Sequence, residues 1–265
     1  MQKKIMTHIV AGYPSLKESE EIAIAMSSAG ADFIEIQIPF SDPIADGPAI
    51  MFANQKALDN GVKVDDCFRL MKNLTKKTNE ISAKQKFLFM TYFNILFRFG
   101  IEKFCREAKK CGCYGLIVPD MPIDEEKNEH YLKYCKKYRI NPIQVVSPLT
   151  SEKRLEIISK HAKGFVYCVS RYGITGTSKA LNNRLKQYLA KVKRVTSLPL
   201  AVGFGISNHD QIKVVHKYAE IAVVGSKFIE IIKTYKGLER LRRIKQFCGG
   251  GGGGGGKISS QKKAD

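Results

Sequence analysis

Two carboxylates lie close together in one short segment near the N-terminus. Glu35 is in the middle of a β-rich run, residues 33–38, and Asp46 lies on the proline-rich loop that follows. Isoleucines alternate with Glu35 along the run, so its side chain is expected on the opposite face of a strand. A carboxylate in mid-strand is costly unless that face meets water, a ligand or a partner charge. The pair therefore predicts acid–base chemistry rather than packing.

Strand-like and helix-like runs alternate along the chain and must position these carboxylates. The β-rich runs are expected at 5–11, 33–38, 87–92, 115–119, 142–147, 164–170, 200–204 and 221–225. Amphipathic helical runs are expected at 16–29, 64–76, 101–110, 125–138, 151–160, 181–195, 208–217 and 227–247. This alternation predicts an α/β protein with a parallel sheet. Eight units favour a single (β/α)8 TIM barrel over residues 1–248.

Two sequence features bear on alternative architectures. An open, doubly wound sheet is typically marked by a glycine-rich dinucleotide turn after the first strand, and residues 11–14 lack that pattern. Residues 249–265 begin with eight consecutive glycines and continue with a polar tail, which predicts a flexible segment.

Charge and cysteine content exclude several function classes. The net charge of +19 raises the question of nucleic-acid binding, but the basic residues are spread over amphipathic helices without a nucleic-acid motif. Solvated helix faces are the favoured interpretation, and no apolar run is long enough to span a bilayer. Seven cysteines without framework spacing predict free thiols in a reducing cytoplasm, and no metal site.

Glycines follow the last two predicted strands, at the rim where barrel enzymes bind their substrates. Gly203 and Gly205 follow one strand, while Gly225 and Ser226 follow the other at the start of a helix. Backbone N–H groups at such turns and at a helix N-terminus bind anions. We therefore expect a phosphorylated small substrate. The glycine-containing loop 171–178 has the composition of a mobile lid, although an ordinary connection has the same composition.

Several motifs together resemble the tryptophan synthase α subunit family. They are IEIQIPFSDPIADGP at 34–48, VPDMP at 118–122, SRYGITG at 170–176, GFGIS at 203–207 and GS at 225–226. They occur in the family order and spacing, and the resemblance runs from about Ile9 to about Lys233.

The resemblance implies retro-aldol cleavage of indole-3-glycerol phosphate to indole and glyceraldehyde 3-phosphate, without a metal or organic cofactor in this subunit. Glu35 matches the acid–base group, and Asp46 matches the residue that hydrogen-bonds the indole N–H. A carboxyl group enclosed in a barrel is suited to exchanging protons near neutrality. Asp46, on a wetter loop, is expected to stay ionised and to act electrostatically.

The resemblance also implies substrate contacts and a partner. The matching substrate-binding positions are Tyr92, Tyr167, Thr175, Gly176, Phe204, Gly205, Gly225 and Ser226. Pro39 and Asp42 lie where the family meets its β subunit, a pyridoxal-phosphate enzyme that receives indole through a tunnel. The expected assembly is an allosterically coupled αββα heterotetramer in the cytoplasm, with roles in tryptophan biosynthesis.

Three positions depart from the family pattern. Gln37 replaces a glycine, His8 replaces an aromatic residue, and Met51 replaces a glutamine. The usual N-terminal helix is also expected to be missing or very short. Because Gln37 and His8 would crowd the indole end, an alternative is a catalytically impaired α subunit retained as an allosteric activator of the β subunit. A basic nucleic-acid-binding barrel is a third, less favoured interpretation.

Overall fold

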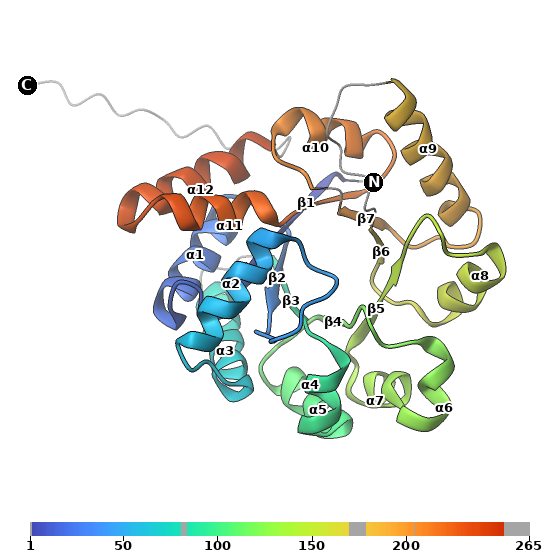
Figure 1. Ribbon diagram of the computed structural model, residues 1–265, viewed down its shortest axis with the longest axis horizontal. Coiled ribbons are helices and arrows are strands. Elements are labelled where there is room, and N and C mark those ends of the chain that lie inside the picture. The colour runs from blue at the N-terminus through green and yellow to red at the C-terminus, as the bar shows by residue number, and fades with distance from the viewer. Residues whose placement is uncertain (1, 81–83, 170–178, 204, 252–265) are drawn as a thin grey trace, which may run out of the picture.

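Eight parallel strands close into a barrel, and the helices lie around it (Figure 1). The computed structural model describes residues 2–80, 84–169, 179–203 and 205–251. Each strand pairs with the next along the chain, and β1 also pairs with β8. The strands are β1 (Lys4–Val10), β2 (Phe33–Gln37), β3 (Lys86–Met90), β4 (Gly115–Ile117), β5 (Asn141–Val146), β6 (Val166–Val169), β7 (Leu200–Gly203) and β8 (Ile221–Val224). The predicted (β/α)8 barrel is confirmed.

The helices follow the strands as crossover connections. They are α1 (Leu16–Ser28), α2 (Pro48–Asp59), α3 (Val64–Glu80), α4 (Phe93–Phe99), α5 (Ile101–Lys110), the 3-10 helix η1 (Ile123–Glu125), α6 (Glu126–Glu129), α7 (Tyr131–Tyr138), α8 (Glu152–His161), α9 (Lys179–Lys193), α10 (His209–His216), α11 (Ser226–Thr234) and α12 (Gly237–Gly251). Side chains of Ser15, Ser151 and Asn208 accept hydrogen bonds from the first turns of α1, α8 and α10. Within the described ranges, every helix falls short of the length or apolar character that a bilayer span requires.

Side chains of each strand alternate between the barrel interior and the surrounding helices. Phe33, Leu88, Ile143 and Phe165 belong to the interior cluster. Ile34 and its alternating neighbours instead belong to the larger cluster between the sheet and the helices. Because side chains alternate every two residues along a strand, Glu35 lies on the same face as Phe33. This is the interior face that the sequence predicted.

The helix boundaries differ from the predicted ones in three ways. Helices α2 and α4 were not among the predicted helices, although Pro48 at the first turn after Gly47 is a known helix-start signal. The single helix expected at 125–138 is divided because His130 has the left-handed φ of 56°. The helix expected at 227–247 is divided between α11 and α12.

Helix α12 continues into the glycine run, through Gly249, Gly250 and Gly251. His209 of α10 stabilises this end, because its Nε2 lies 2.8 Å from the Phe247 carbonyl oxygen and its ring stacks on the Phe247 ring. The remaining glycines and the polar tail lie outside the described residues.

All seven cysteines are buried and free, as the sequence predicted. Burial raises the pKa of the Cys111 thiol to about 12, and it raises the pKa of Cys113 further. The neighbouring Cys111 and Cys113 thiols therefore stay protonated near neutral pH.

Candidate functional site

Glu35 lies inside the barrel with only 3% of its surface exposed. The parallel register pairs Glu35 with His8 on β1 and with Leu88 on β3. Its Oε1 lies 3.2 Å from Nδ1 of His8, which is also buried. Burial by itself lowers the pKa of His8, but the Glu35 carboxylate, assisted by Asp46 and Gln37, raises it above the ordinary value. The carboxylate thus has a positively polarised partner inside the barrel.

Asp46 lies on the loop between β2 and α2, directly above the interior face of β2. Gln37 donates a hydrogen bond through Nε2 to Asp46 Oδ2 at 2.6 Å. The same loop is held by the Tyr92 hydroxyl, which accepts from Ala45 N at 3.1 Å, and by Asn54 of α2, whose Oδ1 accepts from Phe40 N at 3.0 Å. The unpredicted helix α2 therefore helps to position one of the two predicted carboxylates.

The environment of Asp46 differs from the wet loop that the sequence suggested. The residue is half-buried, and burial raises the pKa of its carboxyl group. The Gln37 hydrogen bond, the His8 charge and the Tyr92 hydroxyl oppose this rise without cancelling it. Asp46 is consequently an enclosed carboxylate held by hydrogen-bond donors, not a solvated one.

Three polar atoms of this cluster are buried without a hydrogen-bond partner in the described part of the chain. They are His8 Nε2, Glu35 Oε2 and Gln37 Oε1. Buried polar groups in folded proteins are almost always paired, and an exception calls for a ligand or another specific reason. The three atoms come from neighbouring strands, and together they mark a polar ligand site in the barrel interior.

The predicted phosphate-binding glycines lie at the ends of β7 and β8. Gly225 immediately precedes α11, and Ser226 is the first residue of that nine-residue helix. Gly203 ends β7, and Gly205 has the left-handed φ of 66°, which a side chain would strain. A Cβ at Gly203 would lie 3.1 Å from the Tyr167 hydroxyl, so glycine permits the close approach of this ring. This end of the barrel has the geometry of an anion site.

The remaining predicted site residues have different outcomes. Tyr167 is half-buried and packs against the interior cluster, while Tyr92 is fully buried there. Burial, with the nearby charges of Glu35 and Asp46, raises the pKa of Tyr167. Phe204, Thr175 and Gly176 lie outside the described residues.

The predicted partner-contact residues have unequal exposure. Asp42 is exposed, whereas Pro39 is buried within this chain. Of these two predicted interface residues, only Asp42 has an exposed side chain. Its neighbour Ile44 is 81% exposed, a large apolar residue that sequence reasoning missed.

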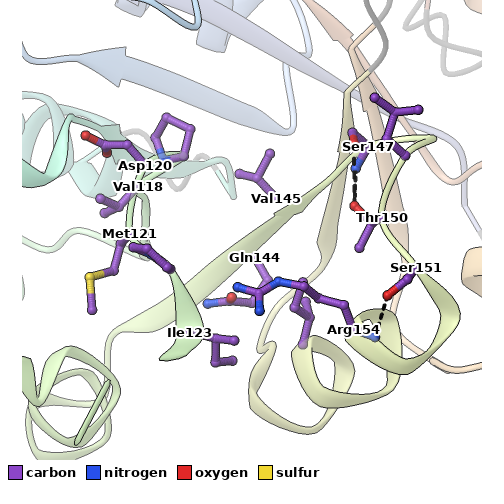
Figure 2. Close-up of a pocket in the computed structure, with 14 residues that line it drawn as sticks. Val118, Asp120, Met121, Ile123, Gln144, Val145, Ser147, Thr150, Ser151 and Arg154 are labelled. Carbon is purple, nitrogen blue, oxygen red and sulfur yellow. Dashed lines mark hydrogen bonds between the residues drawn. The ribbon is translucent and has the colours of Figure 1, made fainter. Parts of the chain in front are cut away.

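A cavity of about 560 Å³ lies between the loops that follow β4 and β5 (Figure 2). Figure 2 shows Asp120 and Met121 on one side and Gln144 and Arg154 on the other. Its lining residues include neither of the two carboxylates and none of the glycines described above. Asp120 has a structural function, because its Oδ1 accepts from Phe93 N at 2.8 Å at the start of α4. The cavity and the carboxylate cluster are therefore formed by different residues.

No metal site competes with this acid–base arrangement in the described ranges. Among their His, Cys, Asp and Glu side chains, no group of three or more is arranged to hold a metal ion. The contacts His8–Glu35 and Gln37–Asp46 were the features that sequence reasoning missed. Strand alternation indicated the interior face, but only the register between β1 and β2 places His8 opposite Glu35.

The sequence model of the tryptophan synthase alpha chain matches residues 1–249 of this chain. The chain belongs to the tryptophan synthase α chain family. A relative from Desulfotalea psychrophila is 42% identical over 228 residues, which cover 86% of this chain and 87% of the relative. A relative from Desulforapulum autotrophicum is 41% identical over 247 residues, or 92% and 94% of the two chains.

Solved structures of the family have the same fold. The tryptophan synthase A-subunit from Pyrococcus furiosus superposes with a TM-score of 0.83 at 31% identity, covering 94% of this chain and 98% of that one. A chain of tryptophan synthase from M. tuberculosis gives 0.82 at 28% identity, with coverage of 94% and 92%. This protein is therefore a tryptophan synthase α subunit, a carbon–carbon lyase that cleaves indole-3-glycerol phosphate, and its family implies a β-subunit partner.

The buried charge of Asp46 predicts a gain in stability when it is removed. Because its folded-state pKa is raised, ionisation destabilises the fold above that pKa, and the penalty vanishes below the unfolded value of 3.8. Asp46→Asn is therefore expected to increase the free energy of unfolding near neutral pH. Urea unfolding at several pH values measures this gain, which should shrink as the pH falls toward 3.8.

Asp42→Asn is the matched control, since Asp42 is an exposed carboxylate of the same loop. Its effect should stay within about 0.5 kcal/mol. A gain for Asp46→Asn that persists unchanged at low pH would contradict the burial argument.

Proposed function

We propose that Glu35 is the acid–base group of the cleavage reaction and that Asp46 stabilises charge on the indole ring. The observation that carries the proposal is the buried Oε2 of Glu35, which has no partner within the described residues and belongs to a carboxyl group held at its other oxygen by His8. An acid–base group needs one oxygen that is free to exchange a proton and a fixed orientation toward the substrate. Glu35 has both.

The proton balance of the reaction follows from these positions. Glu35 Oε2–H gives its proton to ring carbon C3, forming a C–H bond and leaving a carboxylate. The carboxylate then takes the proton of the glycerol hydroxyl while the bond from C3 to the side chain breaks. The electron pair of that bond returns to the ring, and the products are indole and glyceraldehyde 3-phosphate, with Glu35 protonated again.

Asp46 suits the electrostatic part of this reaction. Protonation at C3 places positive charge on the ring nitrogen, and a fixed carboxylate lowers the energy of that state. Gln37 holds Oδ2 of Asp46, which leaves the other oxygen for the indole N–H. The phosphate of the substrate is assigned to Gly205, Gly225 and Ser226, where the N-terminus of α11 supplies unpaired N–H groups.

The alternative of an allosteric activator without lyase activity is not favoured. The family match covers nearly all of the described chain, and both carboxylates are present in one enclosed cluster. The departures at His8 and Gln37 add polar partners to these carboxylates instead of removing either one.

Replacing the acid–base group tests the proposal directly. Glu35→Gln removes the exchangeable proton while preserving shape, so kcat for indole-3-glycerol phosphate cleavage is expected to fall by about 100-fold or more. The assay measures indole release by the purified protein alone and with its β subunit. Retained turnover in Glu35→Gln would contradict the assignment, and β-subunit stimulation surviving without any wild-type turnover would favour the activator.

Removing the Gln37 side chain tests whether it crowds the indole pocket. Gln37 is completely buried on the same face as Glu35, two residues closer to the carboxyl end of β2. Gln37→Gly also removes the hydrogen bond to Asp46, and kcat/KM is still expected to rise several-fold because a net steric interference of roughly 1 kcal/mol disappears. Gln37→Leu, which keeps the bulk without the amide, should give no increase. An unchanged or lower kcat/KM in Gln37→Gly would contradict the crowding argument.

We further propose that the β subunit binds the loop between β2 and α2 and the neighbouring helix α4. Asp42, Ile44 and Phe97 are exposed there, and large apolar residues that are exposed together are typical of interaction surfaces. The proposed assembly is a cytoplasmic αββα heterotetramer. In it the β subunit carries pyridoxal phosphate and receives indole from this subunit, which uses no cofactor of its own.

A charge placed on this surface should weaken the assembly. Ile44→Asp is expected to reduce the affinity for the β subunit by about 10-fold or more, because a buried unpaired charge replaces an apolar contact. The activity of the free subunit should remain within about two-fold. Leu238→Asp is the control, since Leu238 is equally exposed but lies on α12. Titration of β-subunit activity with each variant measures its affinity for the β subunit. Equal affinities of Ile44→Asp and Leu238→Asp would contradict the proposed surface.

A further inference from the structure

His8 is the residue that forms an ion pair with the proposed acid–base group in the described structure. The two residues are directly paired in the register of β1 and β2, and Nδ1 lies 3.2 Å from Oε1. Both side chains are at most 5% exposed. Because adjacent parallel strands hold both backbones, the pair is part of the barrel wall and not a chance contact of mobile side chains.

The atoms of the pair that face away from the His8–Glu35 contact indicate what the pair can do. His8 Nε2 and Glu35 Oε2 are both buried, and neither has a hydrogen-bond partner among the described residues. A histidine that only filled the place of an aromatic ring would leave a strongly polar nitrogen without compensation. We propose that His8 and Glu35 act as one acid–base pair, in which His8 orients the carboxyl group through Nδ1 and stores the proton that Glu35 delivers.

This inference rests on the proposed function of Glu35 and extends it to a positioning residue. In the ion-paired form both ring nitrogens of His8 carry a proton and Glu35 is a carboxylate. Transfer of the Nδ1 proton across the 3.2 Å contact breaks an N–H bond, forms an O–H bond on Oε1 and leaves a neutral imidazole with its proton on Nε2. A half-turn of the carboxyl group then places this O–H at the position of Oε2, toward the substrate. These forms contain the same number of protons. Transfer from Oε2 to ring carbon C3 breaks an O–H bond, forms a C–H bond and leaves a neutral imidazole beside a carboxylate. The hydroxyl proton of the substrate then restores Oε2–H, so no further reactant is needed.

The surrounding charges favour storage of this proton near neutral pH. Burial lowers the pKa of His8, but the carboxylates of Glu35 on β2 and Asp46 on the following loop raise it above the ordinary 6.5. Gln37 acts in the same direction. Gly225, which follows β8, approaches His8 without a side chain, and Tyr167 on β6 is held neutral because burial raises its pKa. The pair therefore loses its proton at a higher pH than an isolated imidazole does.

The experiment compares His8→Asn with the wild type in the full-length protein. Asparagine can place an N–H donor near the position of Nδ1, so it preserves orientation but stores no proton. In the wild type, kcat/KM for cleavage should decline at alkaline pH with a midpoint above 6.5. In His8→Asn this decline should shift to lower pH. At neutral pH, kcat should fall about 10-fold or more while KM changes less than about two-fold.

His8→Phe, which restores the family's aromatic residue, should lose both functions and fall further in kcat. A second measurement does not depend on activity. NMR titration of the His8 ring should give a pKa above 6.5 in the wild type and a lower one in Glu35→Gln, where burial remains and the raising charge is gone. Thermal unfolding verifies that each variant is folded.

The outcomes separate this inference from the proposed function. If Glu35→Gln still cleaves the substrate, the acid–base assignment itself is wrong. If Glu35→Gln is inactive but His8→Asn keeps the wild-type kcat and alkaline limb, only the storage of a proton by His8 is overturned. An unchanged His8 pKa in Glu35→Gln would likewise overturn the pair.

Discussion

The burial of a carboxylate inside the barrel is the constraint on which the site depends. Removing an ionised group from water costs several kcal/mol unless a charge or a hydrogen bond compensates it. His8 compensates for the burial of Glu35. The register of two adjacent strands brings His8 Nδ1 to 3.2 Å from Glu35 Oε1. One carboxylate oxygen is thereby paired with His8, and the other is buried without a partner among the described residues.

The second carboxylate is held by a separate arrangement. Asp46 lies on a loop, so its position depends on contacts from Gln37, from the hydroxyl of Tyr92 and, through the loop backbone, from Asn54. Burial still raises its pKa, which means that these donors do not fully compensate for lost water. Such residual strain is common at functional sites, where stability is given up for a charge in a defined place.

His8 and Gln37 are more informative as a pair than as separate departures from the family pattern. Each one contacts a different carboxylate, His8 with Glu35 and Gln37 with Asp46. From the sequence alone, both substitutions suggested added bulk at the indole end. The contacts add a second effect, a polar cluster in which each of the two carboxylates has a neighbouring donor. The glycines of β7 and β8 lie at the same carboxyl-terminal rim of the barrel, so one enclosed substrate can meet both groups.

Periodicity in the sequence was sufficient for the barrel and for the interior position of Glu35. Both depend on local rules, since alternating isoleucines dictate the face and repeated strand–helix units dictate the architecture. The N-terminus of α2 was also encoded locally by Gly47 and Pro48 but was missed, as was the left-handed His130 that divides α6 from α7. These errors concern boundaries, where single residues compete with an otherwise continuous pattern.

The partners of the two carboxylates were decided only by the tertiary structure. His8 and Glu35 are far apart in the chain, and their contact depends on the stagger between β1 and β2, which hydrophobic patterning does not specify to one residue. The hydrogen bond from Gln37 to Asp46 depends on how the loop folds back over its own strand. Hydrogen bonds from Asn54 and Tyr92 to the loop backbone fix that conformation. Local patterns thus determined which residues face the interior. Long-range packing decided which of them touch, because distances between strands are set by the closed barrel as a whole.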